Sequence, residues 1–223
     1  MWCGDMELGW ELHAAAEAGD VAGLRRLVAQ GVDLNVQLGE KQATALHWAA
    51  FKGRVEVIRV LVVELGVNKE AMGVLGMTPL HWAAHCGQAQ AIRLLVELGA
   101  DKAAGANEGS TPLHVAALYG HFEAIRVLVE LGVDIEAKND HGFTALHIAA
   151  ITGQVEAMKT LADLGAELEP KTVNGRTPLQ LSIHHGQPQA ARVLRELLHA
   201  RDAASPHGPV DMEATAAASK TSE

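Results

Sequence analysis

Aromatic residues are scarce in this 223-residue chain, where they make up 4% of the sequence. A core built on stacked rings is therefore not expected, and Ala, Leu, Val and Ile have to fill the interior. Hydrophobic residues nevertheless reach 48% and charged residues 20%, as in an ordinary folded protein. Small aliphatic side chains favour helices that approach one another closely.

Positive charge is also in short supply. The chain has 18 Lys and Arg against 27 Asp and Glu, which gives a formal net charge of -9. Nucleic-acid backbones and anionic membranes attract clustered Lys and Arg, and the sequence contains no dense basic run. We therefore expect neither a nucleic acid nor a membrane as partner.

Cysteine is limited to Cys3 and Cys86, too few for a disulfide framework. The N-terminus is acidic and has no apolar stretch of secretory length. No segment approaches the roughly 20 apolar residues that cross a bilayer. These features predict an intracellular protein, cytoplasmic or nuclear.

Signatures of catalysis are missing as well. None of the serines has a Gly-x-Ser-x-Gly setting, and there is no phosphate loop or dinucleotide fingerprint. We expect no catalytic residues and no cofactor, so the chain is not predicted to be an enzyme.

The chain contains 12 histidines, so a metal site has to be considered. His81 and His85 have the spacing that places two ligands on one helix face, and Cys86 follows them. However, Trp82 stands where a zinc-protease motif has Glu. We expect no metal site, and a metal- or thiol-dependent enzyme is the remote alternative.

What the sequence does contain is a repeat. The most regular copies of the motif are Thr78-Pro79-Leu80-His81, Thr111-Pro112-Leu113-His114 and their relatives starting at Thr44, Thr144 and Thr177. A weaker copy lies at Glu11-Leu12-His13. The motif leucines are 34, 34, 33, 33 and 33 residues apart, from Leu12 to Leu179.

Each copy carries its own helix signals. Thr is a good N-cap and Pro suits the first helical position, while the Gly six residues after each His, such as Gly120, favours a helix end. An apolar helix pattern ending in a second Gly follows, as in the stretch 91–99. Each unit thus predicts a short helix, a turn, a longer helix and an extended loop, and such short helices need neighbouring units for stability.

The Thr-Pro-Leu-His-x-Ala-Ala pattern at this period resembles the ankyrin repeat. The resemblance implies an all-α solenoid of stacked helix-turn-helix units with hairpin loops, forming one domain over 1–203. The repeats are expected near 6–38, 40–73, 74–106, 107–139, 140–172 and 173–203. Residues 204–223 change composition and are predicted to be a disordered tail.

Two of the copies depart from the period. The second unit has one residue more than the usual twelve between Gly53 and Gly66, so a bulge or shifted helix end is expected around 61–63. Another residue is inserted in the loop near 37–39. The matched positions of the motif histidines, His47, His81, His114 and His147, predict a structural role in satisfying backbone groups, and Trp48 and Trp82 are expected in the core.

In the ankyrin family, partners usually contact the loop tips and the exposed side of the first helix. Carried over by position, this resemblance places Lys41, Ala43, Cys86 and others at the surface. The partner-binding residues that we single out are Phe51, Lys52, Leu75, Met77, His85, Leu118, Tyr119, Phe143, Ile151, Arg176 and His184. Many are aromatic or aliphatic, and an exposed apolar patch is typical of a binding surface.

These observations predict a non-catalytic, monomeric interaction module that binds a partner protein through its concave face. The alternative is a regulator, inhibitor or targeting adaptor of an enzyme, with the tail acting as a switch.

Overall fold

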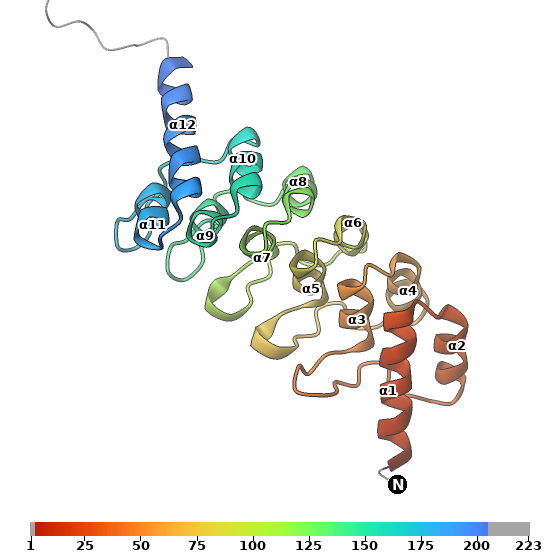
Figure 1. Ribbon diagram of the computed structural model, residues 1–223. Helices are drawn as coiled ribbons and strands as arrows, with labels where there is room; N and C mark the ends of the chain where they lie inside the picture. The colour runs from red at the N-terminus through yellow and green to blue at the C-terminus, as the bar shows by residue number, and fades with distance from the viewer. Residues whose placement is uncertain (1–2, 205–223) are drawn as a thin grey trace, which may run out of the picture.

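The computed structural model describes residues 3–204 and consists of stacked helix pairs (Figure 1). The helices are α1 (Cys3–Ala18), α2 (Val21–Ala29), α3 (Ala45–Phe51), α4 (Val55–Arg59), α5 (Pro79–His85), α6 (Ala89–Glu97), α7 (Pro112–Leu118), α8 (Phe122–Glu130), α9 (Ala145–Thr152), α10 (Val155–Asp163), α11 (Pro178–His184) and α12 (Pro188–Ala204). Within these residues, β-pairing is limited to one isolated antiparallel bridge between Leu38 and Ala43. The expected all-α solenoid is confirmed.

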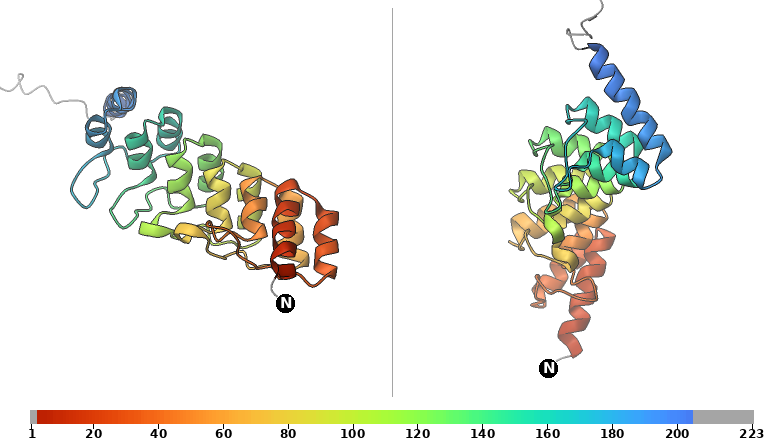
Figure 2. Two further views of the ribbon diagram at one scale, coloured as in Figure 1. Left: turned by 60° about the horizontal axis from the view of Figure 1, so that its bottom comes forward. Right: turned by 90° about the vertical axis from the view of Figure 1, so that its left-hand side faces the viewer.

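The helices form two rows. The first helices of the pairs, from α1 to α11, pack on one another in order, and the second helices stack beside them (Figure 1). The loops between units project from one side of the stack (Figure 2). One apolar core runs through the described units, from Leu12 to Leu194.

The alanine pairs explain how closely the first helices pack. Ala83 and Ala84 in α5, and Ala116 and Ala117 in α7, are fully buried between neighbouring units. A methyl group occupies little space, so successive helices approach without leaving voids. The Gly residues that follow the first helices, such as Gly120 at φ 73°, have the left-handed conformation expected of a helix stop.

The first and last helices differ from the others. α1 begins at Cys3, before the expected repeat start at residue 6, because no Thr-Pro pair interrupts it there. Trp10 occupies the position of the motif Thr, so the buried Nδ1 of His13 has no hydrogen-bond partner among the described residues. α12 continues to Ala204, and the rest of the predicted tail lies outside the described residues.

The extra residue of the second unit forms a π-helical segment, Val60–Glu64, directly after α4. This confirms the expected bulge, which lets Leu61 remain fully buried while Val63 is exposed. A π-bulge accommodates one additional residue without shifting the core face of the helix.

Deleting Val63 is expected to convert this segment into regular α-helix and restore the spacing found in α8. The free energy of unfolding, measured by urea denaturation, should stay within about 0.5 kcal/mol of wild type or rise, because the lost side chain faces solvent. Deletion of Val129 in α8 is the matched control and should cost several times more, since it rotates the end of a regular helix. A large loss on deleting Val63 would show that the bulge itself is needed for packing.

Within residues 3–204, no helix combines the length and the apolar character needed to cross a bilayer.

Candidate functional site

The motif histidines fix the start of each first helix and the loop of the next unit. In four units the ring Nδ1 lies 3.1–3.2 Å from the backbone nitrogen of the motif Thr, as in the Thr111–His114 pair. Nδ1 accepts that bond, so Nε2 carries the proton and donates to a carbonyl of the next unit. The acceptors, at 2.9–3.2 Å, are Met77, Ser110, Phe143 and Arg176. The predicted structural role of these histidines is confirmed.

This arrangement requires neutral imidazole rings. Burial lowers the pKa of His47 to about 4, although its bond to the Met77 carbonyl acts in the opposite direction. Burial likewise lowers the pKa values of His81, His114 and His147. Because three of the acceptor carbonyls belong to Met77, Phe143 and Arg176, the same bonds hold the backbone at predicted partner-binding positions.

A central groove of about 630 Å³ lies between the hairpin tips and the ends of the first helices. The predicted residues that line it are Leu75, Met77, His85, Leu118, Tyr119, Phe143 and Ile151. Leu75 is 59% exposed and Tyr119 45% exposed, whereas Met77, Phe143 and Ile151 are half-buried. The groove therefore presents apolar side chains from three successive units, α5, α7 and α9.

A smaller hollow of about 130 Å³ adjoins this groove and shares Met77 and His85 with it. Its other lining residues are Lys41, Phe51, Val74 and Trp82. The ring of His85 stacks on Phe51 at 6.2 Å between centroids and meets Tyr119 edge-on at 4.1 Å. The two hollows are thus joined by a row of rings that crosses three units.

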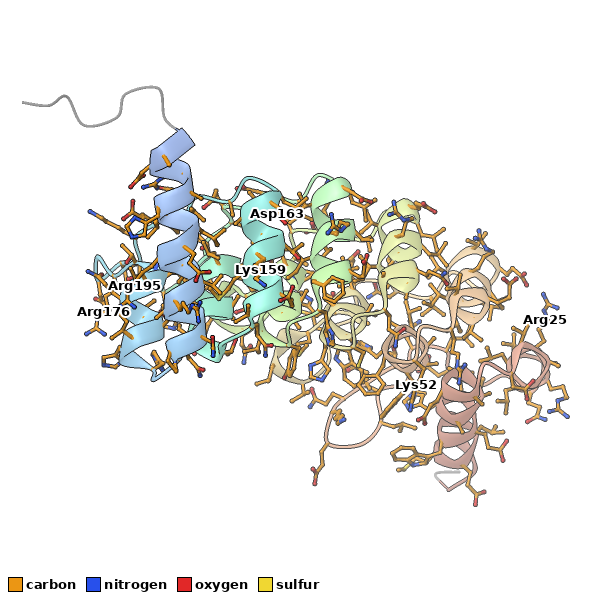
Figure 3. All side chains as sticks on the ribbon, turned by 45° about the horizontal axis from the view of Figure 1, so that its top comes forward. Arg25, Lys52, Lys159, Asp163, Arg176 and Arg195 are labelled. Carbon is orange, nitrogen blue, oxygen red and sulfur yellow. The ribbon has the colours of Figure 1, made fainter. Side chains whose placement is uncertain are left out.

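The remaining predicted residues do not line the two hollows. Lys52 borders the smaller one, with Nζ 5.5 Å over the Phe51 ring, and its ammonium pairs with Glu17 of α1 at 3.1 Å. Arg176 and His184 line a separate shallow hollow at α11. Figure 3 shows Lys52 and Arg176 near opposite ends of the stack. The structure therefore gathers eight of the eleven residues in the two hollows, leaves Lys52 beside them and places Arg176 and His184 apart.

One prediction about the surface and one about the core need correction. Ala43 was expected at the surface but is fully buried, because the extra loop residue folds back and pairs Ala43 with Leu38. Trp82 is buried as expected, whereas Trp48 is only half-buried and one face of its ring meets the Lys41 ammonium. The repeat position alone did not indicate the contact, because Lys41 reaches Trp48 from a loop of irregular length.

His81 and Cys86 are residues on which metal or thiol chemistry would depend. Both ring nitrogens of His81 are engaged, by Thr78 and by the Ser110 carbonyl. Between residues 3 and 204 no group of three or more His, Cys, Asp or Glu is arranged to hold a metal ion. Burial raises the pKa of the Cys86 thiol despite the opposing effect of Lys52 and Lys41, so the reactive thiolate is disfavoured.

Leu75 has an unusual backbone conformation for a bulky residue. It lies at φ 60°, ψ 21° in the hairpin tip before α5, and Glu108 has the equivalent conformation before α7. Left-handed conformations cost a residue with a Cβ about 1–2 kcal/mol. An exposed apolar side chain held at this cost, at the rim of the central groove, is typical of a site where function outweighs stability.

Replacing Leu75 by Gly is expected to raise the free energy of unfolding by about 0.5–1 kcal/mol, because relief of strain exceeds the added chain entropy. Glu108→Gly is the matched control and should raise it by a similar amount. Urea denaturation measures both. A loss of stability in Leu75→Gly alone would mean that the Leu75 side chain contributes packing that outweighs its strain.

A family model described as ankyrin repeats (3 copies) matches residues 12–106, 65–139, 102–172 and 133–205 of this chain. The crystal structure of the human ASB11 ankyrin repeat domain is similar at a TM-score of 0.71 and 29% sequence identity, over 83% of this chain and 82% of that chain. In all, 626 chains of solved structures match, so the likeness identifies an architecture shared by many proteins rather than one partner. No curated protein matched.

Proposed function

The chain belongs to the ankyrin-repeat family, and from this premise we propose that it is a non-catalytic module that binds a partner protein through the central groove and its adjoining hollow. Ankyrin repeats are in general protein-interaction modules. The single observation that carries the proposal for this chain is the continuous apolar lining, from Phe51 through Met77 and Tyr119 to Ile151. Exposed apolar surface of this extent usually marks an interaction site.

The composition of the groove also fits a protein ligand. Tyr119 and Phe143 are large and lose little side-chain freedom on binding, as aromatic anchors at interfaces do. Histidine bonds from the preceding units hold the backbone of Met77 and Phe143 in place, so the surface is organised before binding and less entropy is lost. The expected partner offers an apolar helix or extended segment.

We propose that residues 1–203 act as one monomeric binding unit in the cytoplasm or nucleus. The free thiol of Cys86 supports a reducing compartment, where unpaired cysteines are usual. Sedimentation of the purified chain at micromolar concentration should give the mass of one copy, and a stable dimer would contradict this part of the proposal.

Binding is tested with a triple variant, Met77→Asp, Tyr119→Ala and Phe143→Ala. Proteins captured from a lysate by the wild type are identified by mass spectrometry, and one captured protein is purified for direct titration. The variant should bind it at least about 100-fold more weakly, because truncating a central anchor costs about 2 kcal/mol or more.

The matched control changes the outer helices instead. Phe122 is 44% exposed at the start of α8, and Lys159 and Asp163 lie on α10 (Figure 3). A Phe122→Ala, Lys159→Ala, Asp163→Ala variant should keep wild-type affinity. Circular dichroism must show equal helicity in all three proteins. If the groove variant binds normally and the outer variant does not, the proposed face is wrong.

A further inference from the structure

Three aromatic rings meet at the end of the central groove. Trp48 and Phe51 come from α3 and Trp82 from α5, and we call them the aromatic corner. Their ring centroids are 5.5–5.9 Å apart and their planes cross at 67–81°. Three rings that stand nearly perpendicular to one another form three walls around one space.

A cation already occupies that space. Lys41 Nζ lies 5.5 Å over the Trp48 ring, 5.9 Å over Phe51 and 5.6 Å over Trp82. The nitrogen is therefore almost equally far from all three walls. Attraction between a positive charge and aromatic faces extends to about 6 Å, so the corner has the geometry of a cation site.

A methylated ammonium would fill this site more completely than the bare ammonium does. The Lys41 side chain is exposed, so its three ammonium donors face solvent. The nitrogen lies 5.5–5.9 Å from the ring centroids, whereas carbon atoms pack best at about 3.5–4.0 Å. Methyl groups on the nitrogen, each about 1.5 Å from it, would occupy that gap and contact the rings.

We propose that the aromatic corner binds the trimethylated ammonium of a lysine side chain in a partner protein, and that Lys41 is the intramolecular occupant it displaces. The inference rests on the proposed function, since the partner segment continues from the corner into the central groove past Met77 and His85. That continuity favours a protein side chain over a free small cation. One positive charge replaces another, so the exchange leaves the charge of the corner unchanged.

The displacement requires only a side-chain movement. The Lys41 carbonyl accepts a 2.8 Å hydrogen bond from the Val74 N–H, which ties the loop backbone to the next hairpin. The four-carbon stem of Lys41 is flexible and its side chain is exposed. Lys52, whose Nζ lies 5.5 Å over the Phe51 ring, is held differently because it pairs with Glu17.

The test uses N-acetyl-trimethyllysine methylamide and its neutral isostere, in which a carbon replaces the charged nitrogen. Binding to the full chain is followed by the NMR signals of the Trp indole N–H groups. Lys41→Ala should bind the cation about tenfold more tightly than wild type, and the neutral isostere should bind about tenfold more weakly than the cation. Lys52→Ala is the matched control and should stay within about twofold of wild type.

Equal binding of cation and isostere, or no saturable shift of the Trp48 and Trp82 signals in Lys41→Ala, would overturn the inference. Association of Lys41→Ala with phosphatidylcholine vesicles would assign the corner to a lipid headgroup instead and would also overturn it. A Trp48→Leu change in the Lys41→Ala background should abolish cation binding without altering helicity. If the groove variant still loses its captured partner while no cation binds, the proposed function stands and this inference alone fails.

Discussion

Lowering the pH from 7 to 5 is expected to reduce the free energy of unfolding by about 2 kcal/mol through His47 alone, given its pKa of about 4 in the fold and 6.5 in the unfolded chain. The cause is the buried network in which His47 Nδ1 accepts from Thr44 and Nε2 donates to Met77. A proton on Nδ1 would face the Thr44 N–H and remove the cap.

The sign follows from where the protons bind. Burial lowers the folded-state pKa of His47, so between pH 6.5 and about 4 the unfolded chain binds more protons than the folded chain. The stabilisation is complete above pH 6.5 and is lost as the pH falls toward 4. Burial is also the main cause of the lowered pKa values of four further histidines, His13, His81, His114 and His147. The total loss of stability on acidification should therefore exceed the loss through one histidine.

Urea denaturation at pH 7, 6 and 5, followed by circular dichroism, measures the effect. A His47→Gln variant is the control that this chain itself supplies, since Gln180 occupies the motif position before α11 and its Oε1 accepts from the Thr177 N–H at 3.0 Å. This variant keeps a neutral cap and should lose about 2 kcal/mol less than wild type on acidification. Identical pH profiles would show that His47 does not titrate through folding.

The repeat made much of this fold predictable. A period of 33 or 34 residues, Thr at the helix start and Gly at its end are local signals, and each maps onto one conformation. The extra residue between Gly53 and Gly66 was also predictable from the sequence, because an insertion changes the regular spacing of a repeat. The role of His114 and its equivalents followed from their identical positions in successive units.

The side-chain contacts between units were less predictable. Lys52 lies over the Phe51 ring and also pairs with Glu17 of an earlier unit, and the repeat pattern gave no sign of this ion pair. Lys41 reaches Trp48 and Trp82 because the loop before α3 differs in length from the others. Such contacts depend on which residues happen to face one another across units, and a repeat pattern averages over those differences.

A substitution in a hairpin tip should also have a large effect on stability. Gly142→Ala is expected to lower the free energy of unfolding by about 3 kcal/mol. Gly142 has φ 73°, and a Cβ there would lie 2.8 Å from the backbone nitrogen of Val173 and 3.3 Å from the carbonyl carbon of Thr172. Backbone atoms cannot rotate away as a side chain does. The 3.3 Å hydrogen bond from the Val173 N–H to the His141 carbonyl would have to break or shift.

Gly175→Ala separates the clash from the conformational strain. Gly175 occupies the equivalent place in the next unit, two residues before the motif Thr, and has φ 71° with nothing within 4 Å of an added Cβ. It should cost only the left-handed strain, about 1 kcal/mol after the entropy gain of replacing Gly. Urea denaturation of both variants should therefore differ by about 2 kcal/mol. Equal losses of stability in the two variants would mean that neighbouring hairpins move apart freely. The hairpin tips would then be independent loops, and not the continuous rim on which the preorganised groove depends.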